Sequence, residues 1–329
     1  MHTRRQILAD AFGPEFPVLW CPVVTQYKPG GTIDTDAMRR HMKYLSRFVG
    51  GFLVPGSTGD GWSLTDDESN TVLDLAEEVV STTGTRLLAG VLSTDPVTRL
   101  ARVRSFSSRV APDAPLRGIV VCAPAGKDRT QTEIEADLST ILRIGVPTAV
   151  YQLPQLTENE IEPRTFAALL ERHENLCVFK DSSGADRIAR ELPNSRGAVY
   201  LRGAEGAYFE ALRKNGGAYD GFLLSTANSF PEQLSSIIAS SDAEAAAELS
   251  ARVSSVVETA FRCASTIVGG NAFADANKAI LHFMMHGVEA PLRNGPILRT
   301  GRPISSDILS EVKDSLNSNG LLPKDGLFS

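Results

Sequence analysis

The stretch LCVFKDSSGAD, residues 176–186, places one lysine at the end of a run of apolar residues, directly before a serine-glycine turn. The run is apolar on both of its faces, which is typical of a strand in a parallel sheet that helices cover. Because side chains alternate along a strand, Leu176, Val178 and Lys180 share one face. If Val178 points into the core, we expect the Lys180 amine to point there too.

Seven further runs of apolar or β-branched residues follow the same pattern, and stretches with helical periodicity separate them. They span residues 17–24, 50–56, 86–93, 118–124, 147–154, 198–204 and 221–226. Thr65 and Glu68 have the spacing of a capping box, which predicts a helix start. Eight strands that alternate with helices predict an α/β fold, the (β/α)₈ TIM barrel. A doubly wound sheet is the alternative, but no Gly-x-Gly-x-x-Gly sequence follows the first strand.

The pattern changes after residue 240. Residues 241–329 contain three stretches with helical periodicity and no further strand-like run of the kind described above. We therefore predict a barrel over residues 1–240 that carries the active site. A C-terminal helical domain over residues 241–329 follows it.

Composition argues against several classes of protein. The net charge is -6 and no basic run is present, which argues against a nucleic-acid-binding surface. No apolar run approaches the ~20 residues of a membrane helix, and residues 1–16 lack the apolar core of a signal peptide. The cysteines, at positions 21, 122, 177 and 263, form no Cys-x-x-Cys pair. We expect a cytoplasmic protein that binds neither membranes nor nucleic acid.

The chemistry of a (β/α)₈ barrel takes place at the C-terminal ends of its strands. Of the eight lysines in the chain, only Lys180 lies within a predicted strand. Burial disfavours the ammonium form and lowers the pKa of a lysine, which leaves a free amine able to attack a carbonyl carbon. The alternative is a structural lysine that pairs with Asp181 or Glu205 at the barrel rim.

Tyr151 ends the predicted strand that precedes the strand of Lys180. Neighbouring strands lie ~4.8 Å apart, so a phenol and an amine would lie side by side if both point inward. Formation of a Schiff base needs proton transfers as the carbinolamine loses water, and a tyrosine hydroxyl can relay them. The alternative is a tyrosine packed in the core with its hydroxyl on a backbone carbonyl.

The sequence GSTGD, residues 56–60, follows the second predicted strand. Gly56 and Gly59 let backbone N–H groups turn toward a ligand, and Ser57 and Thr58 add hydroxyl donors, an arrangement that suits a carboxylate. The segment lacks the lysine and the spacing of a phosphate-binding P-loop. A plain turn is the alternative, since most glycine-rich turns bind no ligand.

Taken in order, these segments resemble the dihydrodipicolinate synthase and N-acetylneuraminate lyase family of Schiff-base-forming enzymes, nearly from end to end. The resemblance is carried by GGTIDTDAMRRHMKYL, GFLVPGSTGDGWSLTDDE, YQLPQLT, FKDSSGAD, GFLLSTANSFPEQL and LRNGPILRTGRPI. It implies a lyase with a TIM barrel that acts on pyruvate or a longer 2-keto acid. It also implies a homo-oligomer, a tetramer or a dimer, that uses no cofactor and no metal.

The resemblance implies roles for the residues at the strand ends. Lys180 would form the Schiff base, and Tyr151 and Thr58 would relay protons. The residues expected to contact the substrate are Gly56, Ser57, Gly59, Ser182, Gly203 and Glu205.

Some positions depart from the family pattern. Dihydrodipicolinate synthases carry two tyrosines where this chain has Ala125 and Gly126, and an arginine where it has Leu156. These differences count against dihydrodipicolinate synthesis itself. Of an acidic pair typical of the lyase branch, only Glu205 is present. Gln152 replaces a usual asparagine, which we expect to alter the pocket.

Three classes of function remain open. The first is aldol cleavage or condensation of a 2-keto acid through a Lys180 Schiff base. The second is dehydration of a 2-keto-3-deoxy sugar acid through the same imine. The third is a non-catalytic barrel that binds a keto acid. His282 and His286 have a spacing that could suit a metal, but no third ligand accompanies them, so we expect them to pack between helices.

Overall fold

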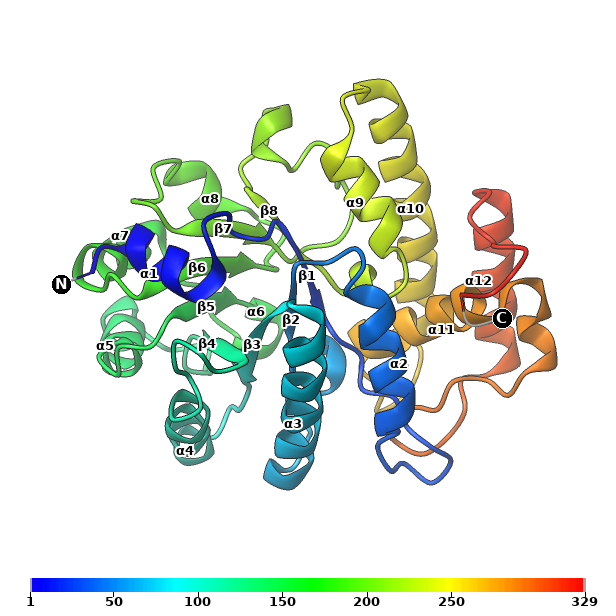
Figure 1. Cartoon of the computed structure of the whole chain (residues 1–329), viewed down its shortest axis with the longest axis horizontal. Helices are drawn as coiled ribbons and strands as arrows, with labels where there is room; N and C mark the ends of the chain where they lie inside the picture. Colours follow the sequence, from blue (N-terminus) through cyan, green and yellow to red (C-terminus); the bar gives the residue numbers. More distant parts are fainter. Residues whose placement is uncertain (1, 328–329) are drawn as a thin grey trace.

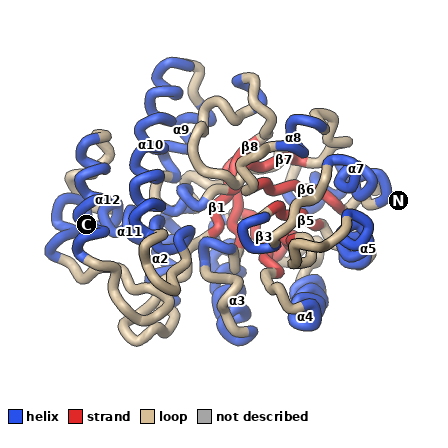
Figure 2. Tube along the Cα trace, turned by 180° about the vertical axis from the view of Figure 1, so that it is seen from behind, coloured by secondary structure: helices blue, strands red, loops and turns tan. Residues whose placement is uncertain are grey.

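A computed structural model describes residues 2–327 and contains a closed barrel of eight parallel strands in sequence order (Figure 1, Figure 2). The strands are β1 (Leu19–Pro22), β2 (Gly51–Leu53), β3 (Arg86–Val91), β4 (Leu116–Cys122), β5 (Thr148–Gln152), β6 (Leu176–Asp181), β7 (Val199–Arg202) and β8 (Gly221–Leu223). Pairing of β1 with β8 closes the sheet. The predicted TIM barrel is confirmed, and the closed sheet excludes the doubly wound alternative.

Helices surround the barrel, as Figure 2 shows, and three more follow it. They are α1 (Arg4–Phe12), α2 (Thr35–Leu45), α3 (Asp66–Thr83), α4 (Pro96–Ser107), α5 (Gln131–Leu142), α6 (Pro154–Thr157), α7 (Pro163–Arg172), α8 (Arg187–Glu191), α9 (Pro231–Ala239), α10 (Ala243–Ala264), α11 (Ala272–His286) and α12 (Ser306–Ser318). The predicted capping box begins α3: the Thr65 hydroxyl accepts from the Glu68 backbone N–H, and the Glu68 carboxylate accepts from the Thr65 N–H.

Side chains from all eight strands fill the inside of the barrel. They include Trp20, Leu53, Leu88, Val120, Ala149, Val178, Leu201 and Leu223, which are completely or almost completely buried. The alternate residues face the surrounding helices, and Phe52, Phe179 and Phe222 belong to that outer core. Val178 therefore points into the barrel, and Lys180 lies on the same face of β6 nearer its carboxyl end.

Helix α1 was not among the predicted elements, although Thr3 and Gln6 form a capping box at its start. It packs against the interior cluster through Leu8 and Phe12, and the Phe12 ring lies 5.8 Å from that of Trp20. Arg4 is 2% exposed, and its guanidinium donates to four backbone carbonyls at 2.5 to 2.9 Å, those of Leu170, His173, Leu176 and Arg196. Because two of these carbonyls belong to the end of α7 and one to the start of β6, α1 covers the amino-terminal end of the barrel.

The connection from β7 to β8 departs from the alternation of strands and helices. Its only regular element is the 3-10 turn η2 (Arg213–Asn215). The segment contains four glycines, and Gly206, Ala207 and Gly216 adopt positive φ angles, which interrupt a helix. Arg202 holds the beginning of this connection by donating to the carbonyls of Ala204 and Gly206.

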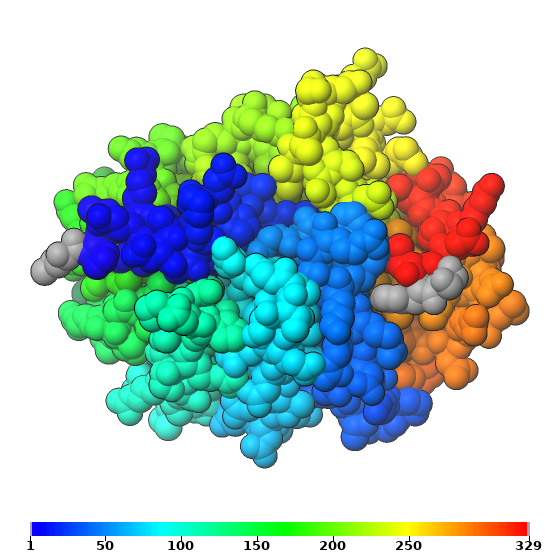
Figure 3. All heavy atoms as spheres, in the orientation of Figure 1, coloured from blue at the N-terminus to red at the C-terminus, as the bar shows by residue number. Residues whose placement is uncertain are grey.

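The predicted helices after residue 240 are present as α10, α11 and α12. In Figure 3 they lie, in yellow, orange and red, at the end of the visible face opposite the dark blue N-terminal segment. The start of α11 reaches back to the barrel, because the Asn271 side chain donates to the Ser57 carbonyl at 2.8 Å. Division of the chain into two domains stays a prediction. No helix within residues 2–327 is both long enough and apolar enough to cross a membrane.

We expect Arg4→Ala to lower the free energy of unfolding by about 2–4 kcal/mol, because four backbone carbonyls, two of them in fully buried hydrogen bonds, lose their donor. Chemical denaturation measures the difference. Arg5→Ala is the matched control, since Arg5 is exposed on the same helix and its loss should change stability by no more than ~0.5 kcal/mol. Equal stability of the two variants would contradict the role given to Arg4.

Candidate active site

Lys180 and Tyr151 lie side by side at the carboxyl ends of adjacent strands. The two residues are register partners in the β5–β6 pair, and each is 2% exposed. The Lys180 nitrogen lies 4.0 Å from the centroid of the Tyr151 ring, over its face. The positions predicted for both side chains, inside the barrel and next to each other, are confirmed.

Burial controls the charge of Lys180. Loss of hydration lowers its pKa from 10.5 to about 7, and the nearby Cys122, Glu205 and Cys21 oppose this only in part. The carboxylates considered as partners from the sequence are engaged elsewhere. Asp181 accepts from the Ser183 backbone N–H at 2.8 Å and from the Tyr219 hydroxyl at 3.2 Å. A substantial fraction of Lys180 is therefore an uncharged amine near neutral pH. A lysine in an ion pair would instead stay charged.

The Tyr151 hydroxyl is an acid that stays protonated. Burial raises its pKa well above the usual value, and hydrogen bonds from Ser182 and Ser57 oppose the rise. Tyr151 thus lies beside the Lys180 amine and near the side chains of Ser57 and Ser182. Within residues 2–327 its hydroxyl makes no hydrogen bond to a backbone carbonyl, which the alternative required.

The segment Gly56–Asp60 forms a tight turn, η1 (Ser57–Gly59), beside these residues. A side chain at Gly59 would approach the Val23 carbonyl to 2.5 Å, so the turn needs glycine there. The Trp62 indole N–H donates to the Ser57 hydroxyl oxygen at 2.9 Å. Ser57 is also one of the side chains that oppose the rise in the Tyr151 pKa. Thr58 is buried in the same turn, and its role stays a prediction.

Gly203 and Ser182 enclose the Lys180 side chain. An added Cβ at Gly203 would lie 2.8 Å from the Lys180 Cε and 2.2 Å from the Ser182 hydroxyl oxygen. Any larger residue at position 203 would therefore displace the amine or the serine. The close approach explains glycine at this position, and a substrate contact for it stays a prediction.

Glu205 has a structural role: it accepts hydrogen bonds from groups that follow β7 and β8. One of its carboxylate oxygens accepts from the Thr226 hydroxyl at 2.6 Å and from the Tyr208 hydroxyl at 2.9 Å. The other accepts from the Ser225 hydroxyl and the Thr226 backbone N–H. These bonds tie the end of β7 to the end of β8. Direct contact of Glu205 with substrate stays a prediction.

Gln152 does not shape the pocket in the way that the sequence suggested. It follows Tyr151 and therefore faces the other side of β5. Its side-chain amide accepts from the Ile161 backbone N–H at 2.9 Å and donates to the Ile161 carbonyl at 3.4 Å. The longer side chain anchors the segment after α6, which corrects the expectation for this position.

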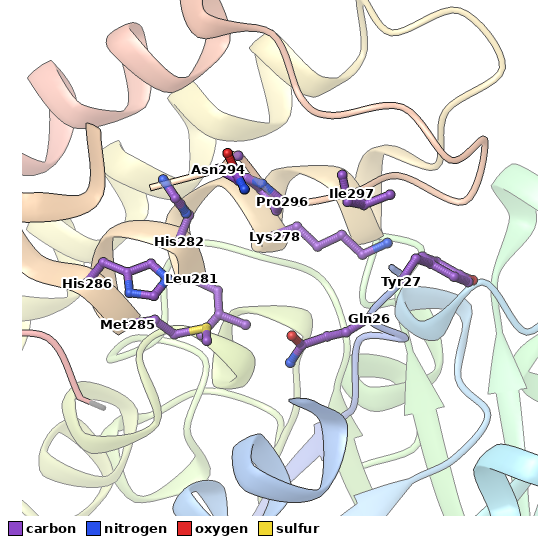
Figure 4. A pocket seen from close by; sticks show the side chains of 11 residues that line it. Gln26, Tyr27, Lys278, Leu281, His282, Met285, His286, Asn294, Pro296 and Ile297 are labelled. Carbon is purple, nitrogen blue, oxygen red and sulfur yellow. The ribbon is translucent and has the colours of Figure 1, made fainter. Parts of the chain in front are cut away.

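A second buried lysine was not found by sequence reasoning. Lys278 on α11 is 3% exposed, its nitrogen lies 3.5 Å from Asp60 Oδ2, and it extends over the Tyr27 ring (Figure 4). Asp60 also accepts from the Tyr27 hydroxyl at 3.0 Å and from Asn271 at 2.9 Å. A cavity of about 160 Å³ adjoins this network. No sequence motif predicts this ion pair, because Asp60 and Lys278 are far apart in the chain.

The two histidines on α11 pack between elements as predicted. His282 Nε2 lies 3.0 Å from the Ala290 carbonyl, its ring lies 5.3 Å from that of His286, and burial lowers the pKa of both rings. Across residues 2–327, no group of three or more His, Cys, Asp or Glu side chains could hold a metal ion.

The chain is an eight-stranded (β/α)₈ barrel with a buried lysine and a buried tyrosine at the carboxyl ends of adjacent strands. This is the end of the barrel where (β/α)₈ enzymes carry out their chemistry. Residues 15–277 match the model of the dihydrodipicolinate synthetase family. The chain belongs to this family, and it is a lyase.

Two relatives illustrate the match. The 4-hydroxy-tetrahydrodipicolinate synthase of Agrobacterium fabrum (strain C58) is 27% identical over 214 residues, which cover 64% of this chain and 69% of that protein. The 4-hydroxy-tetrahydrodipicolinate synthase 1 of Streptomyces coelicolor is 26% identical over 279 residues, which cover 83% and 87% of the two chains.

Solved structures share the fold. A Clostridium difficile protein, CdNal, crystallised with mannosamine, superposes with a TM-score of 0.75 at 17% identity, over 93% of this chain and 99% of that chain. A Sulfolobus 2-keto-3-deoxygluconate aldolase superposes with a TM-score of 0.72 at 15% identity, over 92% and 96% of the two chains. At these identities the likeness concerns the fold alone.

The two buried lysines should respond in opposite ways to replacement by methionine. Between pH of about 7 and 10.5 the unfolded chain binds a proton at Lys180 that the folded chain does not, so stability rises with pH there. Below about 7 the wild type bears the whole cost of burying the charge, on the order of 5 kcal/mol. We expect Lys180→Met to stabilise the protein at about pH 6 and to lose most of this gain by about pH 10.

Lys278→Met is the matched control. It removes one member of a buried ion pair, which costs about 3–5 kcal/mol. Denaturation of both variants and the wild type at the two pH values measures the contrast. Destabilisation by both substitutions at about pH 6 would contradict the difference between the two lysines.

Proposed function

We propose that this protein is a class I lyase that forms a Schiff base between Lys180 and the keto group of a 2-keto acid, and then breaks or forms a carbon–carbon bond. The observation that carries the proposal is the buried Lys180 amine, with its pKa near 7, against the Tyr151 ring. A neutral amine at physiological pH is the form that attacks a carbonyl.

Each step of the proposed reaction uses a residue of the site. The Lys180 amine adds to the keto carbon and forms a carbinolamine, whose oxygen leaves as water after Tyr151 supplies a proton. The resulting iminium withdraws electrons, so the bond between the next two carbons can break and its electron pair forms an enamine. The hydroxyl on the departing carbon gives its proton back to Tyr151 and becomes the carbonyl of an aldehyde. Protonation and hydrolysis then release the product and restore the amine. The turn at Ser57 and Thr58 would hold the carboxylate of the substrate.

Dihydrodipicolinate synthesis itself is not the reaction that we propose. The positions that carry tyrosines and an arginine in such enzymes are Ala125, Gly126 and Leu156 here. None of the three can donate a side-chain hydrogen bond to a second carboxylate. Leu156 lies on α6 with 38% of its surface exposed, so an apolar side chain occupies that part of the rim.

We also propose a cytoplasmic homo-oligomer. The four cysteines are unpaired and buried in the structure, which suits a reducing compartment. Apolar side chains exposed on α4, Val97 and Leu100, would be covered by a second copy of the chain.

Borohydride reduction in the presence of pyruvate should add the mass of the reduced keto acid to the peptide that carries Lys180, because hydride fixes an imine as a stable amine. Lys180→Ala should abolish this labelling. Tyr151→Phe should slow it by roughly 10²–10⁴-fold, since the general acid is lost. Peptide mass spectrometry after timed quenching measures both effects.

Lys214→Ala is the control, since Lys214 is an exposed lysine in η2. Labelling of another lysine, or no labelling by any member of a panel of 2-keto acids, would overturn the proposal.

Product analysis with 2-keto-3-deoxy sugar acids identifies which bond of the substrate breaks. Pyruvate and an aldehyde support carbon–carbon cleavage, whereas a deoxygenated keto acid would show dehydration instead.

A further inference from the structure

We propose that a hollow at the amino-terminal end of the barrel binds a small amphipathic acid, a carboxylate that carries an apolar chain. The hollow has a volume of about 790 Å³ and lies at the opposite end of the strands from Lys180. Small-molecule sites usually have volumes of roughly 300–1,000 Å³. This inference goes beyond the proposed Schiff-base function and does not depend on it.

The hollow lies between α1 and the segments that lead into three neighbouring strands. Its lining comes from residues 2–11, from residues 110–117 at the start of β4, from residues 143–147 before β5 and from residues 172–175 before β6. Helix α1 contacts both β4 and β6 and forms one wall (Figure 1). Because Arg4 fastens this helix to backbone carbonyls of the barrel, the wall is part of a fixed scaffold.

The walls of the hollow are largely apolar. Ile7 and Ala11 on α1 pack against the cluster that fills the barrel. Val110 and Val146, from the segments before β4 and β5, pack against the outer core. Each of these side chains is only partly buried, and its remaining surface lines the hollow. A concave apolar lining of this kind suits the hydrocarbon part of a ligand.

The rim of the hollow carries the arginines 117, 143 and 172. Arg117 donates to the Pro112 carbonyl, and Arg172 is paired with Glu135. Arg143 is exposed, and within residues 2–327 its guanidinium makes no ion pair and no hydrogen bond. A guanidinium presents a planar set of donors that matches the two oxygens of a carboxylate. An arginine without a partner beside an apolar wall therefore favours an acid as the ligand.

The two carboxylates in the lining do not cancel this preference. Glu174 accepts from the Arg4 backbone N–H at 2.7 Å. Asp10 lies on the exposed side of α1, where its carboxylate is 3.7 Å from the His2 ring. Three arginines against two carboxylates leave one positive charge on the lining when the histidines are neutral. The hollow therefore combines an apolar wall with a net positive rim.

Binding of decanoate to the full chain, measured by isothermal titration calorimetry, tests the proposal. Arg143→Gln removes the unpaired cation and should weaken binding roughly 10-fold. Ala111→Asp places a carboxylate in an exposed part of the lining and should weaken binding at least as much. Decyltrimethylammonium has the same apolar chain and the opposite charge. It should bind roughly 10-fold more weakly than decanoate.

Arg40→Gln is the matched control, since Arg40 is an exposed arginine on α2 that does not line the hollow. It should leave the affinity for decanoate within about twofold of the wild type. Lys180→Ala should do the same, because the active site lies at the other end of the barrel. Labelling of wild-type Lys180 by pyruvate and borohydride tests the proposed function separately, so either proposal can fail without the other.

Four results would overturn the proposed acid site. They are unchanged affinity in Arg143→Gln or Ala111→Asp, equal affinity for the ammonium probe, loss of decanoate binding in Lys180→Ala, and no binding of decanoate to the wild type. The last result counts against the proposal even where a second copy of the chain is found to cover the hollow.

Discussion

The site depends on one physical constraint: an amine is held inside a closed barrel where water cannot solvate its charge. Lys180 is placed there by strand alternation, since Val178 on the same face of β6 belongs to the barrel interior. The register with β5 then sets the Tyr151 ring under the amine, with 4.0 Å between the nitrogen and the ring centroid. Three features maintain this burial: closure of the sheet, helix α1 over the amino-terminal end of the barrel, and Gly203 beside the lysine side chain.

Two buried lysines, Lys180 and Lys278, allow the effect of burial on a lysine to be separated from the effect of a neighbouring opposite charge. Lys180 and Lys278 are buried to nearly the same extent, and each lies over a tyrosine ring. Lys278 has the Asp60 carboxylate beside it, whereas the carboxylates near Lys180 accept hydrogen bonds from other groups. Lys278 therefore stabilises the turn through Asp60, whereas Lys180 is the lysine that we propose to react with the substrate.

Much of this could be predicted from the sequence, because strand periodicity and motif order are local signals. The eight strands, the positions of Lys180 and Tyr151 and the capping box of α3 follow from them. Helix α1 was missed although Thr3 and Gln6 form the capping box that begins it, a local signal. What could not be predicted is its place in the fold, since the partners of Arg4 are carbonyls such as that of Leu176, far along the chain. The same holds for the pair of Asp60 and Lys278 and for the bond from Trp62 to Ser57. Gln152 was misjudged because only the fold reveals that its amide meets the Ile161 backbone.

The most direct test of the account is the pKa of the Lys180 amine itself. Competitive acylation of the protein across a range of pH, with the modified fraction of Lys180 measured by peptide mass spectrometry, reports that value without any substrate. The account predicts half-maximal modification at a pH of about 7. A midpoint near 10.5, the ordinary value for lysine, would contradict it.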